Sequence, residues 1–178
     1  MDIYAPYIAV ASIFLALWYI ISQRPSTFSY TRTLSMPHTV DKIFPHVNNL
    51  KKWHDWSPWA QLDPDCKTTY EGPEAGLGAI MKWDGNKKVG TGSMTIISSL
   101  PNTRVMYRLT FIKPFKGTNE AEISFTPEAN GTLVSWTMTG RNNFVGKAMS
   151  LFMDCEKMIG DKFDEGLDNL DETVAKAA

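Results

Sequence analysis

His54 and Asp55 stand side by side in the segment LKKWHDWSPWAQLDP, residues 50–64, between the first two of its three tryptophans. A histidine beside a carboxylate can serve as a general base with its orienting group, as in hydrolytic sites. Neighbouring residues point their side chains apart, however, and no Ser or Cys nucleophile motif accompanies this pair. The pattern therefore favours a hydrated surface pair over a catalytic dyad.

The remaining polar residues indicate no stronger site. Four carboxylates cluster in a segment rich in proline and glycine, where charges usually stay hydrated: Asp63, Asp65, Glu71 and Glu74. The three histidines, His38, His46 and His54, lie eight residues apart, whereas ligands on one helical face need a spacing of three or four. Cys66 and Cys155 stand in no zinc or disulfide spacing and are expected to be buried free thiols. We therefore expect neither a metal nor another cofactor.

The beginning of the chain is apolar. Residues 3–23 carry no charge, and a helix of that length spans about 31 Å, close to the roughly 30 Å of bilayer hydrocarbon. Tyr4 and Tyr7 near one end and Trp18 and Tyr19 near the other resemble the aromatic belts of membrane interfaces. We expect a single transmembrane helix over residues 3–23.

A cleaved signal peptide is the alternative for this segment. It is less favoured, because Asp2 stands near the start, where a signal has a basic residue, and no A-x-A cleavage motif follows. Residues 24–27, RPST, read as a short linker. Arg24 and Arg32 follow the apolar segment, so the positive-inside bias places the rest of the chain in the cytoplasm, at an inner membrane of the bacterial type.

Hydrophobic alternation with a period of two dominates the remaining residues, 28–175, and predicts one antiparallel sheet. The expected strands cover residues 28–36, 79–83, 94–96, 105–111, 121–125 and 134–138. Short helices are expected after Pro37, and a long amphipathic helix from Asn142 or Asn143 to Val174. The expected fold class is α+β, with a curved sheet of about six to seven strands around the C-terminal helix.

Four segments occur in this order along the expected elements: WSPWAQLDP, YEGPEAGLGAIMKWDG, GTLVSWTMTG and GDKFDEGLDNLDE. With that order, residues 28–172 resemble the SRPBCC superfamily of START-like and birch-pollen-allergen-like helix-grip proteins, and within it the polyketide cyclase/dehydrase-like branch. The resemblance implies a large apolar cavity between sheet and long helix that holds lipids or other hydrophobic molecules. This branch shares no catalytic residue set, so none is assigned to this chain.

Large and soft side chains occupy the apolar faces that would line such a cavity. The expected lining residues are Trp56, Trp59, Met81, Trp83, Met94, Tyr107, Phe111, Trp136, Met138 and Phe152. The alternative is that these side chains fill a solid core, since protein interiors pack to high density. Trp56 and Trp59 are expected to face inward and to roof or plug the cavity, with His54 and Asp55 facing water.

Three functions follow as hypotheses. The first is a membrane-tethered module that binds a lipid-like or other hydrophobic small molecule. The second is a cyclase or hydratase acting on a hydrophobic substrate, with Tyr107, His54 or Asp55 as proton donors or acceptors. The third is a regulatory or interaction protein with a solid interior.

The net charge of −1 without a basic stripe argues against nucleic acid as a partner. Four lysines lie in or near expected turns, where hydrated tips are favoured over contact with an anionic leaflet: Lys87, Lys88, Lys113 and Lys116.

Overall fold

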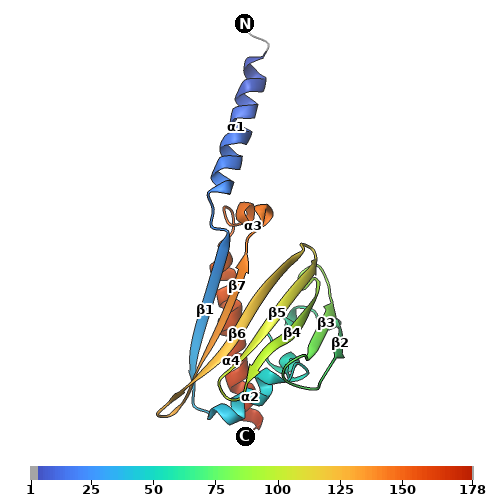
Figure 1. Cartoon of the computed structure of the whole chain (residues 1–178), viewed down its shortest axis with the longest axis vertical. Coiled ribbons are helices and arrows are strands. Elements are labelled where there is room, and N and C mark those ends of the chain that lie inside the picture. Colours follow the sequence, from blue (N-terminus) through green and yellow to red (C-terminus); the bar gives the residue numbers. More distant parts are fainter. Residues whose placement is uncertain (1–3, 178) are drawn as a thin grey trace.

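A seven-stranded antiparallel sheet curves around one long helix in the computed structural model, which describes residues 4–177 (Figure 1). The strand order is β1-β7-β6-β5-β4-β3-β2, so the first strand pairs with the last and the others follow as a meander. The strands are β1 (Thr27–Met36), β2 (Lys67–Glu71), β3 (Ile80–Asp84), β4 (Thr91–Leu100), β5 (Arg104–Lys113), β6 (Gly117–Glu128) and β7 (Gly131–Arg141).

The helices precede the sheet, interrupt it once and end the chain. They are α1 (Ala5–Ser22), α2 (Val40–Asn48), the 3₁₀ turns η1 (Lys52–Asp55) and η2 (Ala60–Leu62), α3 (Phe144–Met149) and α4 (Cys155–Ala177). α4 packs on β1 and α2 and lies within the curve of the sheet. The α+β class, the size of the sheet and the long C-terminal helix are thus as the sequence predicts.

The C-terminal helical region is interrupted between α3 and α4, although the apolar spacing of the sequence indicates one continuous helix. Asn143 begins α3 as predicted, because its side chain accepts a hydrogen bond from the backbone N–H of Gly146. α3 ends at Met149, and Asp154 begins a second helix by accepting a hydrogen bond from the backbone N–H of Lys157 at 2.9 Å. The expected single helix from Asn142 or Asn143 is therefore wrong, because Asp154 caps a new helix in the middle of it.

α1 projects from the upper end of the domain, where β1 begins and β7 ends (Figure 1). Its side chains from residue 7 to residue 20 are exposed. Within residues 4–177, no helix combines the length and the apolar character needed to cross a membrane. The expected transmembrane helix begins at Ile3, which lies outside the described residues, and α1 itself has 18 residues. The structure therefore does not confirm that expectation.

Two buried glycines let α4 approach the sheet and the tryptophan segment. At Gly160 a β-carbon would collide with the guanidinium group of Arg32, which lies across the helix. At Gly166 it would lie 2.7 Å from Cζ3 of Trp136 and 3.1 Å from Cδ of Pro58. The flexible Arg32 side chain can move away from Gly160, whereas the buried Trp136 and Pro58 leave no room at Gly166, so the close contact between α4 and the core depends on Gly166.

Replacing Gly166 by alanine tests this close approach. Overpacking costs about 1–3 kcal/mol, whereas alanine gains at most about 1 kcal/mol over glycine in a helix interior. We therefore expect Gly166→Ala to lower the free energy of unfolding, measured by urea denaturation. Asp168→Ala, at an exposed position of the same helix, is the control and should not lower it. A Gly166→Ala protein as stable as the wild type would contradict the described packing.

Candidate ligand-binding site

The strand registers align the inward-facing side chains in rows across the sheet. In a lower row, Trp136 of β7 pairs with Ile123 of β6, and Ile123 pairs with Val105 of β5. All three are at most 2% exposed. In the next row, Met138 pairs with Ala121 and Ala121 with Tyr107, and these residues are at most 6% exposed. The lower inner face is therefore fully covered.

An aromatic cluster fills the space between these rows and α4. We call it the aromatic plug, and it consists of Trp53, Trp56, Trp59, Trp136 and Phe163. Trp136 stacks on Phe163 with ring centroids 4.2 Å apart and an interplanar angle of 8°. The rings of Trp53, Trp56 and Trp59 approach Trp136 edge-on at 5.6, 5.4 and 5.9 Å. Such contacts contribute beyond simple burial, so the plug closes the lower interior.

In the tryptophan segment, Trp56 faces inward and His54 and Asp55 face water, as the sequence predicts. Trp56 is 1% exposed, and its indole N–H donates a hydrogen bond to the carbonyl oxygen of His46 at 3.2 Å. Trp59 is half-buried, whereas His54 and Asp55 are exposed. The His-Asp pair is therefore a surface feature, and the tryptophans plug the interior.

Tyr107 is held as a structural residue in the lower interior. Its hydroxyl donates a hydrogen bond to the carbonyl oxygen of Val47 at 2.8 Å, and the side chain is fully buried. Burial raises the pKa of the Tyr107 phenol well above its usual value. With His54 and Asp55 exposed, the structure does not bring together the three groups considered for proton transfer.

Burial decreases toward the upper end of the same face. One upper row pairs Met81 with Met94, Met94 with Leu109, and Leu109 with Asn119. Met94 is buried, but the other three are only half-buried. The upper part of the inner face is therefore less completely covered by the rest of the chain.

The outermost row and the edge at β1 also carry apolar side chains that are only half-buried. Trp83 and Phe111 flank Gly92 in register, and their rings meet edge-to-face with centroids 5.9 Å apart. At the other side, Phe28 lies against Gly140 and stacks on Tyr30 at 4.8 Å. We call the half-buried set the upper inner face: Phe28, Met81, Trp83, Leu109, Phe111 and Asn119.

Asn119 supplies a polar group among these apolar side chains. Its amide nitrogen lies 4.0 Å from Sδ of Met138, the distance of a weak hydrogen bond to sulfur. An amide that makes only a weak contact can exchange it for a stronger partner. The upper inner face thus combines apolar area with one group able to orient a ligand.

The ten expected lining residues separate by depth. Five lie in the buried core: Trp56, Met94, Tyr107, Trp136 and Met138. Four are half-buried: Trp59, Met81, Trp83 and Phe111. Phe152 lies in the turn between α3 and α4 and is 85% exposed, so its expected place on the buried helix stripe is wrong. Whether any of these residues contacts a ligand stays a prediction.

Phe28, Leu109 and Asn119 belong to the upper inner face but are absent from the expected set. The sequence could have identified Leu109 as an inward-facing residue, because it alternates with Tyr107 and Phe111 on one strand. The position of Phe28 depends on the pairing of β1 with β7, which joins the two ends of the domain. Asn119 is polar and stands outside any hydrophobic pattern.

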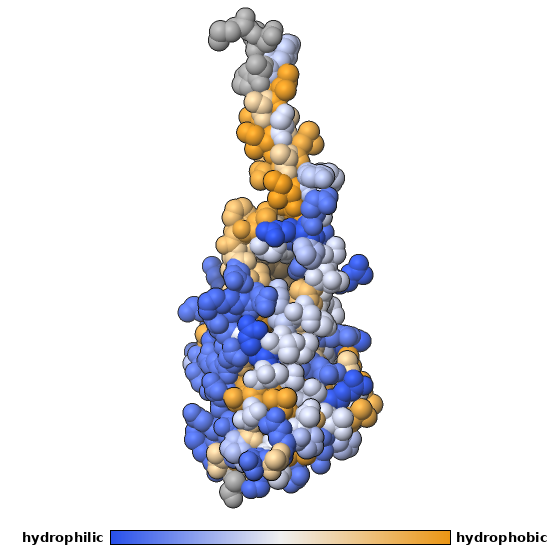
Figure 2. All heavy atoms as spheres, turned by 90° about the vertical axis from the view of Figure 1, so that its left-hand side faces the viewer, coloured by the Kyte–Doolittle hydropathy of each residue, from blue (hydrophilic) through white to orange (hydrophobic). Residues whose placement is uncertain are grey.

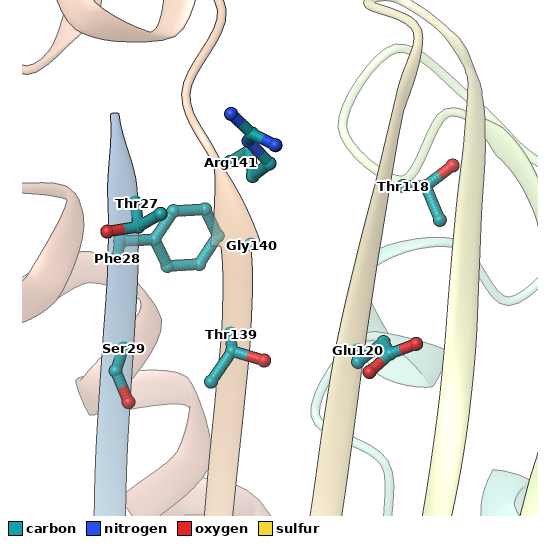
Figure 3. A pocket seen from close by; sticks show the side chains of 8 residues that line it. All are labelled: Thr27, Phe28, Ser29, Thr118, Glu120, Thr139, Gly140 and Arg141. Carbon is teal, nitrogen blue, oxygen red and sulfur yellow. The ribbon is translucent and has the colours of Figure 1, made fainter. Parts of the chain in front are cut away.

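Two hollows on the surface of the described residues are lined without any residue of α4. The larger, of about 550 Å³, crosses the upper ends of β1, β6 and β7 (Figure 3) and is lined by Thr27, Phe28, Ser29, Thr118, Glu120, Thr139, Gly140 and Arg141. Ser29, Thr139 and Glu120 are cross-strand neighbours that alternate with the core residues, so they face away from α4. Six of these eight residues are polar or charged, and Phe28 adds an apolar ring, so the hollow has a mixed lining. The smaller hollow, of about 180 Å³, lies beside the β2–β3 hairpin next to Leu50.

The described residues contain no cluster of three or more His, Cys, Asp or Glu placed to hold a metal ion. Cys66 and Cys155 are free and half-buried.

The comparisons with family profiles and with solved structures each found a match. The sequence profile of a family described as "Polyketide cyclase / dehydrase and lipid transport" matches residues 27–175. No curated protein matches the chain.

Three solved structures illustrate the fold similarity. A protein from Mesorhizobium loti is 11% identical, with a TM-score of 0.63 over 85% of this chain and 99% of its own. The di-domain ARO/CYC StfQ from the steffimycin biosynthetic pathway is 11% identical, with a TM-score of 0.61 over 85% of this chain and 52% of its own. The Aha1 dimer from Colwellia psychrerythraea is 15% identical, with a TM-score of 0.59 over 83% of this chain and 96% of its own.

The buried hydroxyl of Tyr107 leads to a prediction about stability and pH. At neutral pH, Tyr107→Phe leaves the Val47 carbonyl without its partner and should lower the free energy of unfolding by about 1–2 kcal/mol. Because the folded-state pKa of Tyr107 is raised, the folded chain keeps a proton that the unfolded chain loses above about pH 10. Wild-type stability therefore falls as the pH rises through that region, and the phenylalanine variant lacks this contribution.

Urea denaturation of both proteins at neutral and alkaline pH measures the effect. The difference in stability between wild type and variant should shrink above about pH 10. A difference that stays constant would contradict the described burial of the hydroxyl.

Proposed function

The chain belongs to the polyketide cyclase / dehydrase and lipid transport family, and we propose that it binds a lipid-like molecule on the upper inner face while α1 holds it at a lipid bilayer. Membership in the family supports a role in binding or cyclising a hydrophobic molecule. The observation that carries the finer proposal is the decrease in burial along one face, from Trp136 at 2% exposed to the half-buried Leu109 and Phe111.

The two halves of the inner face have different roles in this proposal. The aromatic plug occupies the lower half, so a ligand finds no room beside Trp136 and Phe163. The upper half keeps apolar side chains partly in contact with water, and covering them with a ligand gains roughly 25 cal/mol per Å². Met81 can adapt its shape, Trp83 and Phe111 supply large flat surfaces, and Asn119 can orient a polar head group.

α1 supports the proposed attachment to a bilayer. Its exposed side chains from residue 7 to residue 20 carry no charge. Exposure of so much apolar surface to water is unfavourable, and a lipid phase removes that cost. We further propose that the domain lies on the cytoplasmic side of a bacterial-type inner membrane, because Arg24 and Arg32 follow the uncharged segment 3–23 and basic residues favour that side.

The other two hypotheses receive less support from the geometry. The enzymatic hypothesis relied on Tyr107, His54 and Asp55, which the structure places apart, one buried and two exposed. The hypothesis of a solid interaction protein agrees with the aromatic plug but does not account for the half-buried apolar row at the upper end. A binding role accounts for both the aromatic plug and the half-buried apolar row.

The ligand proposal is tested by placing a charge on the upper inner face. We expect Leu109→Arg to weaken binding of a naturally fluorescent polyene fatty acid at least about tenfold. A tenfold loss of affinity corresponds to about 1.4 kcal/mol, and burying an unpaired charge under the ligand costs more than that. The measurement is a fluorescence titration of the fragment 24–178, with its fold checked by circular dichroism.

Ile112→Arg is the matched control for this titration. Ile112 lies on the same strand, but alternation turns it to the opposite face, where it is 49% exposed. Equal affinities for Leu109→Arg, Ile112→Arg and the wild type would rule out the upper inner face as the binding site.

The attachment proposal is tested by flotation of the full chain with phosphatidylcholine vesicles. Introducing Ile13→Asp and Leu17→Asp together places two charges on one side of α1 and should abolish flotation, since charges are costly in lipid. The control Leu77→Asp with Leu100→Asp makes the same chemical change at exposed apolar positions of the domain. If the α1 variant floats like the wild type, α1 is not the attachment.

A further inference from the structure

A cluster of exposed apolar side chains surrounds the break between α3 and α4. We call it the α3–α4 rim: Phe144, Val145, Phe152, Met153 and Met158, which are 50%, 46%, 85%, 44% and 49% exposed. Apolar colouring continues from α1 onto the adjoining upper end of the domain in Figure 2. Side chains of this size gathered at one end indicate a contact surface.

Hydrogen bonds fix this rim beside the end of α1. Lys147 of α3 donates through Nζ to the carbonyl oxygen of Ser22, the last residue of α1, at 3.1 Å. Asn142 donates its backbone N–H to the carbonyl oxygen of Ser26 at 2.9 Å and its side-chain amide to that of Pro25 at 3.4 Å. α3 accordingly lies directly beneath α1 in Figure 1.

The short connection between α1 and β1 limits the distance between the rim and the bilayer that is proposed to hold α1. Only residues 23–26 separate α1 from β1, and four extended residues reach about 14 Å at most. A bilayer that receives α1 therefore lies within reach of the rim.

The turn between β5 and β6 presents a second group of the same kind at the upper end of the sheet. Phe115 is 58% exposed and Ile112 49% exposed, and the exposed Lys113 and Lys116 flank Phe115. Apolar side chains interleaved with lysines suit the interface of an anionic bilayer. Two carboxylates also lie near the rim: that of Asp154, which caps α4, and that of the exposed Glu156.

We propose that the α3–α4 rim rests on the same bilayer that holds α1, so that the upper inner face receives its ligand directly from the lipid. This inference rests on the proposed attachment through α1 and adds a second contact with the same bilayer. A lipid surface is favoured over a protein partner, because the rim continues the apolar surface of α1 and basic residues share the same end of the domain.

The test uses the full chain in vesicles of phosphatidylcholine and phosphatidylglycerol, some containing nitroxide-labelled lipid. In a background with Cys66→Ser and Cys155→Ser, a fluorescent label is attached through Phe152→Cys. Matched labels are attached through Leu77→Cys, in the β2–β3 connection at the far end of these strands, and through Trp18→Cys in α1. Nitroxide lipids quench only labels that touch the bilayer.

The proposal expects loss of emission at positions 152 and 18 and unchanged emission at 77. Quenching at 18 but not at 152 overturns the rim contact and leaves the attachment through α1 intact. Quenching at neither position overturns both. A label at 152 that is shielded from an aqueous quencher before vesicles are added indicates a protein contact, which also overturns the lipid assignment.

Hydrogen exchange of the chain with its native cysteines provides the second measurement. We expect vesicles to slow amide exchange in α3 and residues 150–154, whereas exchange in the β2–β3 connection stays unchanged. Equal exchange at the rim with and without vesicles would overturn the proposal. This measurement does not depend on the folding of the variant with Cys66→Ser and Cys155→Ser.

Discussion

The stacking of Trp136 on Phe163 is the contact on which the rest of the domain depends. It joins the last strand to the long helix with nearly parallel rings, and Gly166 leaves room for it. Three further tryptophans from the segment between α2 and β2 close around the pair. Because these rings bury a large area with fixed geometry, they set the distance between α4 and the sheet.

This arrangement moves the candidate site toward α1. With the lower interior filled, the apolar face that remains partly exposed lies at the upper end of β3, β5 and β6. The same end carries the α3–α4 rim and the connection to α1. The proposed ligand-binding face, the apolar rim and an uncharged helix thus occupy neighbouring positions, and the proposed supply of ligand from a bilayer follows from that proximity.

Local patterns predicted much of the fold. The alternation of Val105, Tyr107, Leu109 and Phe111 identified the inward face of β5, and of the two expected helix starts, Asn142 and Asn143, the second is the one observed. The break before Cys155 was missed, because Phe152 fits the apolar spacing of one continuous helix while the capping by Asp154 depends on local backbone geometry. The sequence also did not show how deeply each side chain of the inner face is buried. Tyr107 and Phe111 show the same alternation, and only the packing of distant segments makes one fully buried and the other half-buried.

The most direct measurement of the central claim is photo-crosslinking of the full chain, in phosphatidylcholine vesicles, with a fatty acid that carries a diazirine near the end of its tail. Mass spectrometry of the digested protein then locates the attachment. The account predicts adducts on the segments of β3 and β5 that contain Trp83, Leu109 and Phe111. Adducts confined to the residues around Ser29 and Arg141 in the larger surface hollow, or an absence of adducts on the domain, would contradict it.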